Sequence, residues 1–112
     1  MAIAPDTKWT DDEIVFSDMT PDTLFVFDRM TVETLRAVDA RPGEKVLDVA
    51  CGRSIDAFSL SKSGADIFGV EASDTMLEKS REYLGANADK VTLTRALAEN
   101  LPFADNSFDK VV

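Results

Sequence analysis

Two short segments of the chain carry residue types that a ribose-containing ligand requires. In the first, an apolar run ends at Asp48 and Val49, and the small residues Ala50-Cys51-Gly52 follow it. A ligand can closely approach the backbone N–H groups of such a turn. In the second, an apolar run ends at Glu71, where a carboxylate can accept hydrogen bonds from two ribose hydroxyls. Together, the turn and the acid indicate a nucleotide-type binding site.

The residues between these two segments predict the elements that hold them in place. Residues 45–49 and 66–70 are apolar runs of strand length, and residues 55–63 follow a helical pattern that Gly64 closes. A strand, a tight turn, a helix and a second strand that ends in an acid form the nucleotide-binding half of an open α/β sheet. The sequence therefore predicts an α/β fold.

Further elements are predicted on either side of this unit. They are helices over residues 21–38 and 74–84, strands over residues 91–94 and 107–112, and a loop over residues 98–106. Thr20 before Pro21 is a helix-capping pattern, and Ser73 supplies the same capping hydroxyl for the second helix. The chain thus divides into an acidic N-terminal segment, residues 1–19, and one domain, residues 20–112.

Composition narrows the possible functions. The 112 residues are 45% apolar and 29% charged, which is typical of a globular protein. A net charge of −9 disfavours binding to nucleic acid or to an anionic membrane. Because Cys51 is the one cysteine and histidine is absent, we expect no disulfide, no activated nucleophile and no metal site. A membrane-spanning run and a signal pattern are also absent from the sequence, so a cytoplasmic location is expected.

Four sequence blocks together resemble a known family. They are residues 41–52 (RPGEKVLDVACG), 69–77 (GVEASDTML), 98–103 (AENLPF) and 107–112 (SFDKVV). In order and spacing they are similar to the N-terminal half of class I S-adenosylmethionine-dependent methyltransferases, of the small-molecule, type 11-like kind. The resemblance implies part of a Rossmann-like three-layer sandwich with a mostly parallel sheet of about four strands. Right-handed crossovers then give the strand order 3-2-1-4, with helices mainly on one face.

The resemblance also implies a role for each candidate site residue. Asp48 and the backbone of Ala50-Cys51-Gly52 would face the methionine part of S-adenosylmethionine, and Glu71 would hold both ribose hydroxyls. Ala72 and Met76 would flank the adenine, Leu97 and Ala98 would form the turn that reads the adenine edge, and Phe27-Asp28-Arg29 would border the cofactor. Neither a catalytic residue nor a metal ligand is implied.

Ordinary structural roles remain open for several of these residues. Asp48 can cap the turn after a strand, and Glu71 can be a solvated acid at a strand end. Met76 and Phe27 fit a hydrophobic core equally well. Arg29 fits a surface ion pair.

The chain departs from the family pattern at three positions around the cofactor. Where the family turn has glycines, Ala50 and Ser54 stand here, and Leu97 replaces an aspartate that accepts a hydrogen bond from the adenine amino group. A side chain at positive φ costs about 1 kcal/mol or more. Loss of the adenine contact costs roughly 1–3 kcal/mol. We therefore expect S-adenosylmethionine to bind with weakened or altered affinity.

Two functions fit this reading. The first is the S-adenosylmethionine-binding portion of a small-molecule methyltransferase, not catalytically competent alone because the family has about seven strands and carries its acceptor pocket in the half that is missing here. The alternative is a non-catalytic methyltransferase-like protein that acts through self-association or a partner. A nicotinamide-dependent oxidoreductase is disfavoured because the fingerprint Gly-x-Gly-x-x-Gly is not met.

The same fold predicts two uncovered surfaces. One face of the sheet receives no helix, and the outer edge of the strand over residues 107–112 has no neighbouring strand. Covering such surfaces is the rule in parallel sheets. We expect a homodimer through the uncovered face or this strand edge, or coverage by residues 1–19 with their apolar Trp9, Ile14, Val15 and Phe16.

Overall fold

A four-stranded parallel sheet lies at the centre of the protein. The computed structural model describes residues 20–112. The strands are β1 (Lys45–Val49), β2 (Asp66–Glu71), β3 (Val91–Arg95) and β4 (Lys110–Val111), and the helices are α2 (Pro21–Val38), α3 (Ile55–Ser61), α4 (Asp74–Leu84) and the 3₁₀ helix η1 (Gly85–Lys90). The strands lie in the order β3-β2-β1-β4, and every neighbouring pair is parallel. The predicted fold class and strand order are confirmed.

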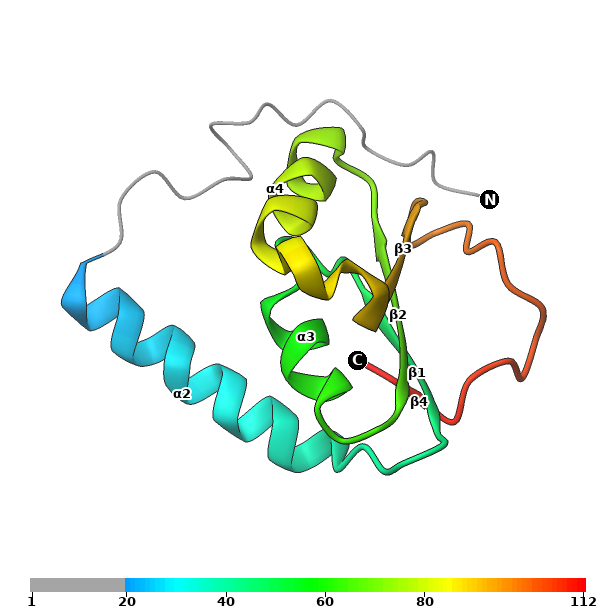
Figure 1. Ribbon diagram of the computed structural model, residues 1–112, viewed down its shortest axis with the longest axis horizontal. Coiled ribbons are helices and arrows are strands. Elements are labelled where there is room, and N and C mark those ends of the chain that lie inside the picture. Colours follow the sequence, from blue (N-terminus) through cyan, green and yellow to red (C-terminus); the bar gives the residue numbers. More distant parts are fainter. Residues whose placement is uncertain (1–19) are drawn as a thin grey trace.

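Helices α2, α3 and α4 lie on one side of this sheet (Figure 1). Helices α3 and α4 cover the sheet directly, and α2 packs outside them against α3. Alternate strand residues point toward the helices, as the period of a pleated strand requires. The resulting core contains Val46, Ile67 and Val91 from the strands, Ala57 and Leu60 from α3, Ala65, and Leu84 from α4.

The opposite face of the sheet carries a cluster of phenylalanines. Phe68 of β2 lies on this face, and Phe103 and Phe108 reach it from the segment between β3 and β4. The ring centroids of Phe103 and Phe108 are 4.9 Å apart in an edge-to-face arrangement that aromatic pairs favour. This segment runs along the side of the sheet away from the helices (Figure 1). The face is therefore less open than the sequence predicts, although Val111 of β4 stays 63% exposed.

The helix ends follow their capping residues. Thr20 Oγ1 accepts a hydrogen bond from the Thr23 N–H at the start of α2, and Ser73 Oγ accepts one from Met76 at the start of α4. Helix α4 has its predicted bounds. Helix α3 ends at Ser61, two residues earlier than predicted, because the N–H groups that follow bond three residues back and tighten the chain into a 3₁₀-like turn.

A reciprocal pair of hydrogen bonds joins the start of β1 to Asp109, the residue before β4. The Lys45 N–H donates to Asp109 Oδ2 over 2.8 Å, and the Asp109 N–H donates to the Lys45 carbonyl over 2.8 Å. Strand β4 is shorter than the predicted strand over residues 107–112. The predicted packing of Trp9, Ile14, Val15 and Phe16 lies outside the described residues, so the division of the chain at residue 20 stays a prediction.

Candidate cofactor site

The candidate site lies where β1 and β2 end. The turn over residues 50–54 leaves β1 and leads into α3, and Glu71 is the last residue of β2. Open parallel sheets bind ligands at the carboxyl ends of their strands, so this edge is the expected place. The adjacent start of α4 brings Met76 to the same edge.

The turn adopts a backbone conformation that glycine favours. The φ angles of Ala50, Gly52 and Ser54 are 57°, 56° and 64°. Ala50 and Ser54 therefore occupy the left-handed region, where a Cβ costs about 1–2 kcal/mol. Ala50 and Ser54, which stand where the family turn has glycines, therefore both have a positive φ, at which a side chain is strained.

Glu71 is bonded to backbone groups on both sides of the site. Its Oε1 accepts a hydrogen bond from the Gly52 N–H over 3.1 Å, and its Oε2 accepts one from the Ser73 N–H over 3.0 Å. The acid therefore ties the turn to the start of α4 and is not merely a solvated strand-end residue. Met76 closes the same corner, because a Cβ built on Gly52 would lie 3.3 Å from its terminal methyl carbon.

Asp48 is the acid of the site whose pKa is shifted most. It is 7% exposed, and burial, then Asp56, then Glu71 raise its pKa from 3.8 to about 7. Desolvation and neighbouring negative charges both disfavour the ionised carboxylate. A cationic group placed beside it would favour the ionised form.

Cys51 serves the packing of the turn. A Cβ built on Gly69 would lie 2.8 Å from Cys51 Sγ, so the thiol occupies the space that a side chain on β2 would need. Burial is the largest cause that raises the pKa of this thiol to about 11, which leaves it protonated at neutral pH. The Cys51 N–H also donates to the Val70 carbonyl over 3.0 Å.

Leu97 and Ala98, the residues assigned to the adenine edge, follow the next strand of the sheet, β3. Leu97 and Asn100 close a tight turn through an N–H···O bond of 3.0 Å, with Ala98 and Glu99 at its tip. The Ala96 N–H donates to the Glu71 carbonyl over 3.2 Å, which keeps this turn next to the end of β2. The structure thus brings the sequence-predicted residues to one edge of the sheet.

Arg95 is a site neighbour that the sequence reasoning missed. Its Nε donates to the Ala72 carbonyl over 3.2 Å, and its Nη1 lies 3.2 Å from Asp74 Oδ2. The guanidinium therefore fastens the segment that would flank the adenine. The signal that could have identified it is strand register, since Arg95 pairs with Glu71 across β2 and β3.

Phe27-Asp28-Arg29, the residues predicted to border the cofactor, lie on α2. Arg29 pairs with Glu33 over 3.0 Å on an exposed side of the helix, which is the surface role left open by the sequence. Asp28 is exposed, and Phe27 is partly buried. Helix α2 is linked to the site region by the Thr31 hydroxyl, which donates to Asp56 Oδ1 over 3.0 Å.

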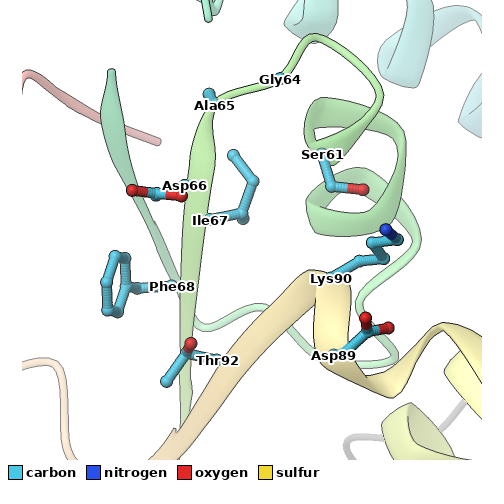
Figure 2. A pocket seen from close by; sticks show the side chains of 9 residues that line it. All are labelled: Ser61, Gly64, Ala65, Asp66, Ile67, Phe68, Asp89, Lys90 and Thr92. Atoms are coloured by element: carbon cyan, nitrogen blue, oxygen red, sulfur yellow. The ribbon is translucent and has the colours of Figure 1, made fainter. Parts of the chain in front are cut away.

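A hollow of about 290 Å³ lies at the other end of the strands, away from these residues (Figure 2). In Figure 2, Asp66 and Phe68 point to one side of β2 and Ile67 points to the other, so its lining side chains do not converge. We therefore place the candidate site at the carboxyl edge. Within residues 20–112 no acidic or cysteine side chains are grouped to hold a metal ion, and no described helix has the length and apolar character of a membrane span.

Comparisons with known proteins agree with this geometry. A demethylmenaquinone methyltransferase of Clavibacter sepedonicus is 42% identical over 80 residues, which cover 71% of this chain and 32% of that relative. Methyltransferase GfsG of Streptomyces halstedii is 38% identical, over 75% of this chain and 31% of the relative. The crystal structure of PH0226 protein from Pyrococcus horikoshii OT3 matches with a TM-score of 0.73 and 27% identity, over 92% of this chain and 50% of that chain.

These matches define the class of protein. The parallel sheet in the order β3-β2-β1-β4 is also the fold shared with a SAM dependent methyltransferase from Aquifex aeolicus, which matches at a TM-score of 0.63 and 19% identity over 84% of this chain and 56% of that chain. The model of the methyltransferase domain family matches residues 46–112, and the chain belongs to this family. It spans about a third of the length of the curated relatives that it matches.

Proposed function

We propose that this chain binds S-adenosylmethionine at the carboxyl edge of β1 and β2, as the cofactor-binding portion of a small-molecule methyltransferase. The observation that carries the proposal is the position of Glu71 beside the Gly52 turn. An ionised carboxylate has about four lone-pair positions. Each Glu71 oxygen bonds one described backbone N–H, so each keeps capacity to accept a ribose hydroxyl.

Charge at the site favours a cationic ligand. S-adenosylmethionine supplies a sulfonium methyl group that is already activated for transfer, so positioning dominates the chemistry. Asp48 stands at the end of β1 with a pKa near 7, and a neighbouring cation would hold it ionised. We assign Asp48 and the Ala50-Cys51-Gly52 backbone to the methionine end, Ala72 and Met76 to the faces of the adenine, and Leu97 and Ala98 to its edge.

In this function, residues 20–112 hold the cofactor and do not by themselves transfer the methyl group. Binding of an acceptor and methyl transfer would require more of the fold than these four strands supply. Relatives named for demethylmenaquinone methylation match over about a third of their own length, so we leave the acceptor at the level of a small molecule. A cytoplasmic location stays a prediction that cell fractionation would test.

Calorimetry with S-adenosylmethionine and S-adenosylhomocysteine tests the proposal. Both should bind, NAD should not, and Glu71→Ala should weaken binding by about tenfold or more because it removes the ribose acceptor. Glu82→Ala, an exposed acid on α4, is the matched control and should leave the affinity unchanged. Absence of heat and of thermal stabilisation with both sulfur nucleosides would refute cofactor binding.

A second candidate is a non-catalytic methyltransferase-like protein that acts through self-association or a partner. The observation that favours it is the outer edge of β4, where Val111 is 63% exposed. We infer a homodimer through this edge or through the adjoining sheet face that carries Phe68. Light scattering at high micromolar concentration should then give twice the monomer mass, and Val111→Lys should return the protein to a monomer. A monomer in the unmodified protein would exclude this candidate.

A further inference from the structure

Two buried serines meet hydroxyl to hydroxyl between the turn and α4. Ser54 and Ser80 are both 0% exposed, and their Oγ atoms are hydrogen-bonded to each other. Ser80 Oγ also donates to the Gly52 carbonyl over 2.9 Å. The single hydroxyl proton of Ser80 goes to the Gly52 carbonyl, so the bond between the two serines is donated by Ser54, whose other contact is a weak one of 3.8 Å to Cys51 Sγ. The hydrogen bonds therefore run from Ser54 through Ser80 to the Gly52 carbonyl.

Gly52 is consequently held from two sides. Its N–H donates to Glu71 Oε1, and its carbonyl accepts from Ser80. The peptide groups before and after Gly52 are both fixed in orientation, at a φ of 56°. These are the backbone groups of the turn to which we assign the cofactor.

The serine at position 54 explains how the turn tolerates the loss of a glycine. At a φ of 64°, glycine would be free of steric strain and serine is not. The Ser54 hydroxyl, however, reaches Ser80 at full burial, and a buried hydroxyl is stable only when it has a partner. The substitution replaces the conformational freedom of a glycine with a fixed contact to α4.

We propose that Ser54 and Ser80 are a positioning pair, which holds the Gly52 peptide groups in the orientation that receives S-adenosylmethionine. The inference rests on the proposed function and adds two residues to it that carry no role in the assignments above. In this role the pair acts through the backbone of Gly52 and not by touching the cofactor.

Calorimetry of the full chain with S-adenosylhomocysteine tests the pair through Ser54→Ala, Ser80→Ala and the double variant. Ser80→Ala should weaken binding about fivefold, the effect of one buried hydrogen bond. The double variant should bind no more weakly than Ser80→Ala, because the Ser54 hydroxyl acts through Ser80. Ser61→Ala is the matched control, since Ser61 makes a similar bond to the Phe58 carbonyl within α3, and its affinity should be unchanged.

Amide hydrogen exchange at Gly52 in the cofactor-free protein is the second measurement. Exchange should be about fivefold faster in Ser80→Ala and unaltered in Ser61→Ala, with near-native circular dichroism in both. An unmodified protein that does not bind S-adenosylhomocysteine would refute the proposed function, while the exchange rates would still show whether the pair fixes Gly52. Unchanged affinity in Ser80→Ala, or unchanged Gly52 exchange, would overturn the positioning role.

Discussion

The thiol of Cys51 lies directly over the backbone of Gly69. A Cβ at Gly69 would approach Cys51 Sγ to 2.8 Å, and Cys51 Cβ and Leu93 Cδ2 to 3.2 Å each. Side chains essentially never sit at the shorter distance, so β2 must carry glycine for the turn after β1 to take its observed position. The glycine in the second strand and the cysteine in the turn are thus one packing unit.

Gly69→Ala should lower the free energy of unfolding by about 1–3 kcal/mol, because the added methyl overpacks this contact. Chemical denaturation provides the measurement. Adding Cys51→Ala to Gly69→Ala should recover part of the loss, since it removes the closest atom. If the effects of the two substitutions on the free energy of unfolding are simply additive, the contact with Cys51 is not what requires glycine at position 69.

Asp48 should give the protein a distinctive pH dependence. Its pKa is about 7 in the folded protein and 3.8 in the reference state, so between these values the folded protein holds a proton that the unfolded chain has lost. The free energy of unfolding should therefore fall as pH rises from about 4 to 7, by at most about 1.4 kcal/mol per pH unit. Denaturation of Asp48→Asn over the same range should lack this contribution, and identical profiles for the two proteins would contradict it.

The same carboxyl should make cofactor binding depend on pH. A sulfonium cation favours ionised Asp48, so S-adenosylmethionine should bind more tightly at pH 8 than at pH 6. S-adenosylhomocysteine lacks the sulfonium charge and should show a smaller change. Calorimetry of both ligands at the two pH values makes the comparison, with Asp48→Asn as the control in which the difference disappears.

Ala50→Gly should stabilise the turn. Ala50 has a φ of 57°, where removal of the Cβ relieves about 1 kcal/mol of strain. Thermal or chemical unfolding should show this gain, and S-adenosylhomocysteine should bind at least as tightly. Ala37→Gly, made within α2, is a matched control that should instead lower stability. A loss of stability in Ala50→Gly would show that the observed φ carries no strain.

Leu97→Asp should restore an acceptor for the adenine amino group. Affinity for S-adenosylhomocysteine should rise by about fivefold or more, since one charge-assisted hydrogen bond is gained. The inosine analogue, which lacks the amino group, should show no such gain. Equal effects on both ligands would place Leu97 away from the adenine edge.

Strand order and helix positions could be predicted from the sequence because each depends on local patterns and on the handedness of crossovers. The runs around Val46 and Ile67, the caps at Thr20 and Ser73, and the right-handed connections all point to one topology. The position of the candidate site at the carboxyl edge of the sheet could also be predicted, because β1 and β2 end there.

The finer structure of the site could not be predicted in the same way. The sequence showed that Ala50 and Ser54 replace glycines, but the sign of φ at each position depends on the tertiary path of the turn. The contact between Ser54 and Ser80 joins residues from separate elements, and Arg95 reaches Ala72 only through the register of β2 and β3. Such pairings have no local periodicity that would reveal them.

The reciprocal bonds between Lys45 and Asp109 have a kinetic consequence. They connect positions 64 residues apart along the chain, and they anchor the strand at the end of the sheet. The pairing of β4 with β1 is therefore the least local contact of the sheet, whereas β1 with β2 and β2 with β3 pair strands that are consecutive in the sequence. We therefore expect the three-strand unit with α3 and α4 to assemble first during refolding, and the arrival of β4 to be the last and rate-limiting event.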